Sequence, residues 1–215
     1  MLRKLFHILA AASVMVGCNT AHLENSTEVG WLAVDFSYGD ETKAGDIDLS
    51  GYSVSIKGNA PLDYSLESTC GELPAVLELK PGDYEISVSS PNAAQAAFTP
   101  IYSSSKDFTI SAGQTRSVSL LLSNVQVSFQ TSDSFNADTV DSCLIVVSNG
   151  EDELTWSLDD VLDGRTGYFT GASKLYIHLE GTARNSVALR YDDVIYDVRQ
   201  SEHYRITLGE YVPVI

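Results

Sequence analysis

Three acidic clusters in the second half of the chain are the first candidates for chemistry, because carboxylates can hold a metal ion. They lie at residues 133–141, at residues 151–153, and at Asp159, Asp160 and Asp163. A calcium ion takes roughly six to eight oxygen ligands, and its best-known loop has a fixed spacing that none of the clusters follows. The third cluster comes closest to a metal site. The alternative is a solvated loop or the acidic end of a helix.

No other catalytic pattern accompanies these carboxylates. The sequence has no Gly-x-Ser-x-Gly, no His-Glu-x-x-His and no phosphate-binding loop. His178 and His203 follow the patterns of surface histidines on a strand and near a turn. Paired carboxylates for glycoside hydrolysis stay open, because the sequence does not fix the distance between them. We therefore expect a protein that is not an enzyme and that carries no cofactor.

Aromatic side chains suggest a different kind of site, which is contact with a ligand such as a sugar. Tyr102, Tyr168, Phe169 and Tyr191 lie near expected turns, where aromatic rings are exposed or cover the end of a core. Trp156 instead alternates in step with leucines, which predicts a place in the core. The four turn aromatics are the candidates for ligand contact.

The first 28 residues predict export from the cytoplasm. Residues 1–17 form a signal peptide, in which Arg3 and Lys4 precede an apolar run at 5–16 and a small residue stands at the cut. The run of about 12 residues is shorter than the roughly 20 that a membrane-spanning helix needs. The polar segment 18–28 is then a short tether.

The end of the signal resembles a bacterial lipobox. Met15-Val16-Gly17-Cys18 has the apolar residue, the small residue and the Gly that precede the invariant Cys of that motif. The resemblance implies a diacylglyceryl thioether on Cys18 and an acylated new N-terminus. Each buried methylene contributes about 0.8 kcal/mol and one chain anchors only marginally, so two or three chains hold a protein firmly. The membrane is therefore an expected partner, through lipid on Cys18.

The mature chain is strongly acidic but otherwise has the composition of a folded protein. Without the signal, 11 Lys and Arg remain beside 29 Asp and Glu, which gives a formal net charge of −18. This charge repels nucleic acid, which we exclude as a partner. The chain is 44% hydrophobic and patterned, which excludes disorder. Cys70 and Cys143 lie in different halves, and Cys143 is expected to be a small buried apolar residue.

Alternation of apolar and polar residues predicts β-strands along the whole mature chain. The strands that begin at Trp31 and Tyr52 are followed by others, and the same order starts again at Val125 after about 90 residues. This length with several short strands suits a β-sandwich. We expect an all-β fold of two tandem transthyretin- or immunoglobulin-like sandwiches, at 29–123 and 124–215, joined by a short junction into an elongated rod.

Three local features add detail to this pattern. Pro81-Gly82 predicts the turn of a hairpin over residues 76–88. The alanine-rich segment 93–97 predicts one helical turn in a loop. Residues 157–162 predict a second helical turn, with Ser157 as its N-cap.

Four segments carry a distinctive succession of motifs, at residues 79–84, 97–102, 106–115 and 122–129. Together with the lipobox, they resemble the Bacteroides-type lipoproteins grouped as domain of unknown function 4493. The resemblance implies a lipoprotein of the outer membrane or cell surface, distantly related to the fimbrillins, whose subunits carry two transthyretin-like sandwiches. The family has no established activity, so the resemblance bears on location and fold.

The function expected from these features is a lipid-anchored surface protein with a non-catalytic structural or adhesive role, and association with a fimbria is one form of it. The alternative is a glycan-binding lipoprotein of a sugar-uptake system, which predicts exposed aromatics gathered on one face or tip. A fimbrial subunit or anchor instead predicts an open sheet edge or groove that accepts a foreign strand. Beyond the membrane, the expected partners are fimbrial or other surface proteins, or glycans.

Overall fold

The structure is a computed structural model that describes residues 28–38, 48–91 and 94–209 of the 215-residue chain. The predicted signal peptide and Cys18 lie outside the described residues. Within them the fold is built almost entirely of strands, which confirms the predicted all-β class. The one described helix, α1 (Leu158–Leu162), has five residues, and no described helix has the length and apolar character needed to cross a membrane.

The first half of the chain folds into two packed sheets. One sheet has the order β4-β1-β8 and the other has the order β3-β2-β5-β7. Alternate residues point into the space between them, as in β5, where Tyr84, Ile86 and Val88 are buried. The strands are β1 (Gly30–Tyr38), β2 (Ser53–Gly58), β3 (Ser65–Thr69), β4 (Leu77–Leu79), β5 (Gly82–Ser89), β7 (Ser103–Ile110) and β8 (Thr115–Leu122).

The second half forms another pair of sheets around a separate core. The orders are β15-β9-β12-β6 and β11-β10-β13-β14. Trp156 lies at the centre of this core and has no exposed surface. The strands are β9 (Val125–Gln130), β10 (Val140–Ser148), β11 (Glu153–Ser157), β12 (Gly167–Phe169), β13 (Lys174–Ala183), β14 (Ala188–Tyr196) and β15 (His203–Thr207), joined by β6 (Ala96–Ala97) from the first half.

The two sandwiches correspond strand for strand. The sheet β4-β1-β8 has its counterpart in β12-β9-β15, and β3-β2-β5-β7 has its counterpart in β11-β10-β13-β14. In both, the first strand pairs in parallel with the last, β1 with β8 and β9 with β15. This correspondence confirms the predicted repeat of strand order, while the boundary between residues 123 and 124 stays a prediction.

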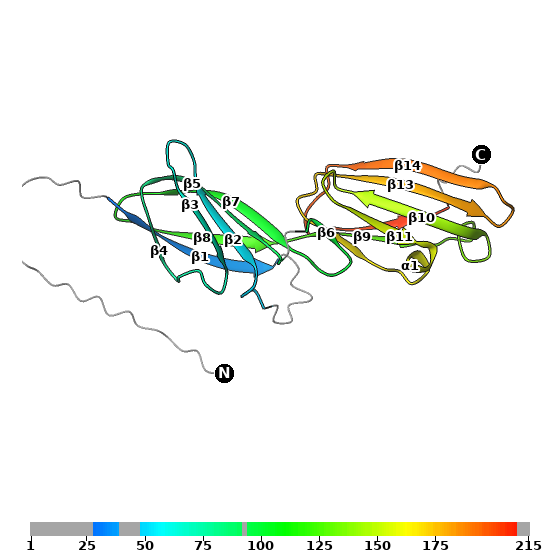
Figure 1. The fold of residues 1–215 in the computed structure, drawn as a ribbon, viewed down its shortest axis with the longest axis horizontal. Coiled ribbons are helices and arrows are strands. Elements are labelled where there is room, and N and C mark those ends of the chain that lie inside the picture. Colours follow the sequence, from blue (N-terminus) through cyan, green and yellow to red (C-terminus); the bar gives the residue numbers. More distant parts are fainter. Residues whose placement is uncertain (1–27, 39–47, 92–93, 210–215) are drawn as a thin grey trace, which may run out of the picture.

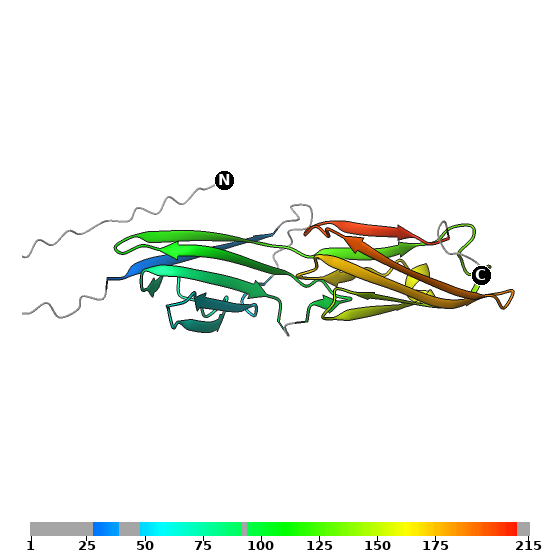
Figure 2. The ribbon, with the colours of Figure 1, turned by 90° about the horizontal axis from the view of Figure 1, so that it is seen from above.

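The sandwiches lie end to end along the long axis of the molecule (Figure 1). Figure 2 shows the same succession from above, with the long strands running roughly along that axis. The chain enters the first sandwich through β1 at the end that is farthest from the second sandwich. The end nearest the predicted tether is therefore opposite the junction.

The predicted hairpin over residues 76–88 is wrong. β4 pairs with β1 and β5 pairs with β2, so Pro81 and Gly82 carry the chain across the core from one sheet to the other. Gly82 has a φ of +151°, and a Cβ atom there would lie 2.3 Å from Leu62 Cδ1. The Tyr84 hydroxyl donates a hydrogen bond to the carbonyl of Lys80 at 2.8 Å, which holds the crossing in place.

Of the two predicted helical turns, the structure has one. Residues 96–97 form the strand β6, because pairing with β12 overrides the helix propensity of alanine. Helix α1 confirms the second prediction. Its N-cap Ser157 accepts from the Asp160 amide, and the Asp160 carboxylate accepts from the Ser157 amide, which makes a reciprocal capping box.

Candidate functional site

A short segment of the first half, residues 94–98 (the strap), docks on the second sandwich. Its strand β6 pairs antiparallel with β12 and extends that sheet. The Phe98 ring meets the Trp156 ring edge to face, with centroids 5.0 Å apart. The Arg165 guanidinium lies over the Phe98 ring, 3.9 Å from its centroid. The strap therefore ties the two sandwiches together through backbone pairing and an aromatic anchor.

Gln95 fixes the start of the strap through four hydrogen bonds. Its carbonyl accepts from the Thr170 amide at 2.9 Å, and its own amide donates to Asp152 Oδ2 at 2.7 Å. Its side-chain nitrogen donates to Glu151, and its side-chain oxygen accepts from Asn149 Nδ2 at 3.3 Å. One of the predicted acidic clusters thus serves to hold the strap.

A groove of about 840 Å³ lies beside the strap, at the junction of the two sandwiches; we call it the serine groove. Eight serines line it, and Glu67 is the one charged side chain in the lining. Ligand sites occur preferentially at such junctions. The lining comprises Ser53, Ser55, Glu67, Ser87, Val88, Ser89, Ala94, Gln95, Tyr102, Ser103, Ser104, Ser105, Ser123, Thr170, Gly171 and Gln200.

Six of these serines form two rows across the outer face of β2, β5 and β7. The strand registers place Ser55, Ser87 and Ser105 side by side in one row, and Ser53, Ser89 and Ser103 in the next. Directly opposite residues have Cβ atoms about 4.5–5.5 Å apart. The strands thereby present a regular array of hydroxyl groups, because the residues between these serines on β2 and β5, Val54 and Val88, point into the core.

Most hydroxyls of the array are available for a ligand. The exception is Ser55, whose hydroxyl donates to Glu67 Oε1 at 2.7 Å. The side chains of Ser53, Ser87 and Ser105 are half-buried or exposed and make no hydrogen bond to any described residue. A hydroxyl is at once a donor and an acceptor, so the array can bind groups of either kind.

The four aromatic candidates do not come together. Tyr102 lines the serine groove, whereas Tyr168 is half-buried on β12 opposite the strap. Phe169 has no exposed surface, because it is an inward residue of β12, and the expectation that it contacts a ligand is wrong. Tyr191 lines a separate groove of about 530 Å³ beside β14 and β15, and its hydroxyl donates to Asp193 Oδ2 at 2.8 Å.

The acidic metal candidates belong to helix α1 and its end. Asp160 accepts from Ser157 and, at 2.7 Å, from Arg165 Nη1. The hydrogen bonds from Ser157, followed by that from Arg165, lower the pKa of Asp160 to about 2. Asp159 and Asp163 are exposed, and Asp163 is the C-cap. Among the described residues, no three acidic, His or Cys side chains gather as a metal site.

Cys70 and Cys143 lie in different sandwiches. Cys143 is buried, as predicted for a small apolar residue, and burial raises the pKa of its thiol to about 11. Cys70 is half-buried, and burial raises the pKa of its thiol as well. Both are free thiols with reduced reactivity.

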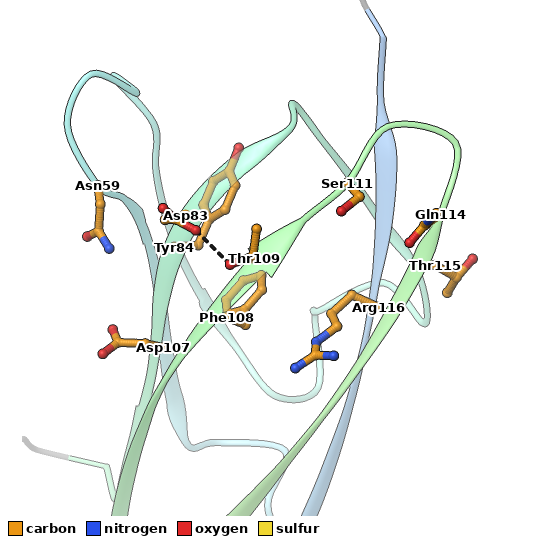
Figure 3. Close-up of a pocket in the computed structure, with 10 residues that line it drawn as sticks. All are labelled: Asn59, Asp83, Tyr84, Asp107, Phe108, Thr109, Ser111, Gln114, Thr115 and Arg116. Carbon is orange, nitrogen blue, oxygen red and sulfur yellow. Dashed lines mark hydrogen bonds between the residues drawn. The ribbon is translucent and has the colours of Figure 1, made fainter.

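A second polar groove, of about 660 Å³, lies at the tether end of the first sandwich (Figure 3). The Thr109 hydroxyl donates to Asp83 Oδ1 at 2.6 Å on one side of it. Asp107 and Arg116 also line it, so this groove mixes charges of both signs. The serine groove differs from it in charge and in its place at the junction.

The serines of the array were absent from the sequence-based candidates, although a signal for them exists. Ser53 and Ser55 alternate with buried residues on β2, and Ser87 and Ser89 do the same on β5. Alternation assigns them to one outer face. The missing information is the register, which places the serines of three strands in common rows.

The two sandwiches, the strap between them and the hydroxyl-lined groove define a two-sandwich β protein. The chain belongs to the family described as Domain of unknown function (DUF4493), whose model matches residues 25–211. This match confirms the family predicted from the sequence. No curated protein matches the chain.

Three solved structures illustrate what the fold is similar to. A candidate adhesin from Bacteroides ovatus has 7% identity and a TM-score of 0.41, over 92% of this chain and 98% of that one. The fimbrial anchor protein Mfa2 from Porphyromonas gingivalis has 12% identity and a TM-score of 0.40, over 76% and 82%. A candidate polysaccharide-binding protein from Bacteroides thetaiotaomicron has 11% identity and a TM-score of 0.40, over 73% and 77%.

Proposed function

We propose that this chain is a lipid-anchored protein of the outer membrane or cell surface with a non-catalytic, adhesive role. The serine groove is its contact surface, and Cys18 carries the lipid. Association with a fimbria is one form that this role takes. The proposal follows from the export signal, the lipobox and the geometry of the junction.

The observation that carries the adhesive role is the hydroxyl array of the serine groove. The rows of Ser55-Ser87-Ser105 and Ser53-Ser89-Ser103 offer a dense set of hydrogen-bonding groups. Among the described residues of the lining, the one carboxylate is that of Glu67, which accepts a hydrogen bond from the Ser55 hydroxyl, and no His, Cys, Lys or second carboxylate accompanies it. Such a surface binds a ligand without changing it.

The position of the groove supports the same role. The tether precedes β1, whereas the groove lies at the other end of the first sandwich, against the second. A chain that is held at Cys18 therefore presents the groove away from the point of attachment. The strap keeps the second sandwich beside the groove.

The adhesive role is tested with beads coated with the full chain, purified in detergent, and exposed to whole bacterial cells and to mucin. Ser87→Trp fills the centre of the array and should abolish bead attachment. Ser117→Trp is the matched control, because Ser117 is an exposed residue of β8 outside the groove. Equal attachment of both variants would remove the serine groove from the adhesive role.

The lipid anchor makes a separate prediction. Cys18→Ala should move the protein from the membrane fraction to the soluble fraction, because the thiol that carries the acyl chains is lost. Cys70→Ala is the control and should stay in the membrane fraction. Retention of Cys18→Ala with the membranes would contradict anchoring at this residue.

A further inference from the structure

The charge of the serine groove contrasts with that of the whole chain. The chain has 29 acidic residues, yet among the described residues that line the groove Glu67 is the one acidic residue, and none is Lys, Arg or His. The Glu67 carboxylate already accepts a hydrogen bond from Ser55 at 2.7 Å. A bound anion would find no cation to pair with, and a bound cation would find one occupied carboxylate. The ligand that fits is uncharged.

The polar groups of the groove narrow the ligand further. Serine hydroxyls each offer one donor and two acceptor positions, and Gln200 adds an amide at the rim. A ligand that matches this lining must itself offer both hydrogen-bond donors and hydrogen-bond acceptors at short intervals. The hydroxyl groups of a sugar do so. The apolar side chains of the described lining are those of Val88, Ala94 and Tyr102, and polar residues outnumber them.

The arrangement of the array fits a chain of sugars more than a single one. Each row crosses three strands, with serines spaced by about 4.5–5.5 Å from strand to strand. Successive rows lie about 6.6–6.8 Å apart, because they are two residues apart along each strand. Tyr102 stands in the lining next to Ser103 and adds an aromatic ring. Hydroxyl rows with a ring at one end suit a polymer that repeats its hydroxyl groups.

We infer that the serine groove binds a neutral, linear glycan that lies across β2, β5 and β7, with its hydroxyl groups bonded to Ser87, Ser105 and their row neighbours. This inference rests on the proposed adhesive function and names its ligand class. The strap contributes one wall, through Ala94 and Gln95. The second sandwich contributes another, through Thr170 and Gly171.

The test is affinity gel electrophoresis of the full chain in detergent, through gels that contain a linear neutral β-glucan, a linear neutral mannan, a neutral xylan or the anionic polygalacturonate. At least one neutral polymer should retard the protein, and polygalacturonate should not. The double variant Ser87→Ala/Ser105→Ala should weaken that retardation about tenfold, the effect of losing two net hydrogen bonds. Ser117→Ala/Ser119→Ala is the matched control on β8 and should behave as the wild type.

The outcomes separate the ligand class from the adhesive role. Retardation by a neutral glycan that the Ser87/Ser105 variant leaves unchanged would overturn the placement of the ligand. Retardation by polygalacturonate alone, or by none of the four polymers, would overturn the ligand class. If the Ser87→Trp variant then still lost bead attachment, the adhesive role of the groove would stand and its ligand would belong to another class. Thermal melts of all variants check that each one is folded.

Discussion

The outer faces of the two sandwiches differ at equivalent positions. Ser87 of β5 and His178 of β13 lie on the outer faces of corresponding strands, and each follows a buried isoleucine, Ile86 or Ile177. In the first sandwich the row through Ser87 consists of serines. In the second, His178 forms an ion pair with Asp192 at 2.5 Å. One strand order thus carries an uncharged, hydrogen-bonding row on β2, β5 and β7 in one copy and a charged pair on β13 and β14 in the other.

The sandwiches also differ in the connection between two corresponding pairs of strands, β5 to β7 in the first and β13 to β14 in the second. In the second sandwich, β13 and β14 are joined by the short turn at residues 184–187. In the first, residues 90–102 join β5 to β7 and carry the strap to the second sandwich. The sheet of the second sandwich therefore contains one strand, β6, that comes from the chain of the first. A repeated fold gains a fixed junction when one connection is long enough to pair with its neighbour.

The largest effect that tests this difference is expected for Phe98→Ala. The ring contacts both Trp156 and Arg165 and is half-buried, so its loss should lower the free energy of unfolding of the second sandwich by about 2–3 kcal/mol. The corresponding loss in melting temperature is roughly 10–20 °C. Trp156 fluorescence, measured in a Trp31→Phe background, reports this transition, since the chain has two tryptophans.

Phe36→Ala is the control for the strap, because Phe36 is also half-buried but packs in the first core. It should leave the Trp156 transition in place and destabilise the first sandwich. If Phe98→Ala destabilised only the first sandwich, the strap would not contribute to the free energy of unfolding of the second.

A smaller effect is expected at the cap of α1, a helix for which the first sandwich has no counterpart. Asp160→Asn should cost about 1 kcal/mol at neutral pH, because the carboxylate accepts from the Ser157 amide. The folded pKa of about 2 lies below the ordinary value of 3.8 for this carboxyl, so the ionised form stabilises the fold above pH 3.8. That contribution disappears as the pH falls through 2.

Urea unfolding of wild type and Asp160→Asn, run at pH 7, pH 4 and pH 2, measures this dependence. The difference in stability should shrink between pH 4 and pH 2. The neighbouring Asp159→Asn should stay within about 0.5 kcal/mol of wild type, as an exposed residue with no part in the cap. A constant difference at all three values would show that the carboxylate charge of Asp160 is irrelevant to the helix.

The smallest effect is expected at the outer face of the second sandwich. Hydrogen bonds to Asp192 and then to Glu180 raise the pKa of His178 above its ordinary value of 6.5. A raised folded pKa means that the stabilisation is complete below pH 6.5 and is lost as the pH rises through the folded pKa. His178→Gln should therefore lower the melting temperature slightly at pH 5.5 and leave it unchanged at pH 9. A larger loss at pH 9 would reverse the assigned sign.

The strand pattern of this chain could be predicted from sequence, and the helix α1 with its cap Ser157 as well, because both depend on neighbours close along the chain. The strap could not be predicted. Its alanines favour a helix, and only pairing with β12, far along the chain, makes residues 96–97 a strand. Pro81-Gly82 between two alternating segments predicts a hairpin. The sequence does not show, however, whether the second strand stays in the same sheet, and here it does not.

The candidate site was less predictable than the fold. Tyr102 was selected for its place near a turn and does line the serine groove, whereas Phe169 was selected on the same ground and is buried. The difference depends on which face of a three-residue strand points inward. The array of Ser87 and its neighbours depends on the register of three strands. Neither quantity is encoded in a local spacing.

The parallel pairing of the first and last strands has a mechanical consequence. The chain enters the first sandwich at the start of β1 and leaves it at the end of β8, and these two strands are bonded side by side from Trp31–Thr115 to Tyr38–Leu122. Tension between the start of β1 and the second sandwich, which follows β8, therefore pulls β1 and β8 in opposite directions along their length. The ladder is sheared, and its hydrogen bonds resist together instead of opening one after another. Forced unfolding follows the unfolding rate, so this arrangement gives the first sandwich resistance to a pull along the long axis of the molecule.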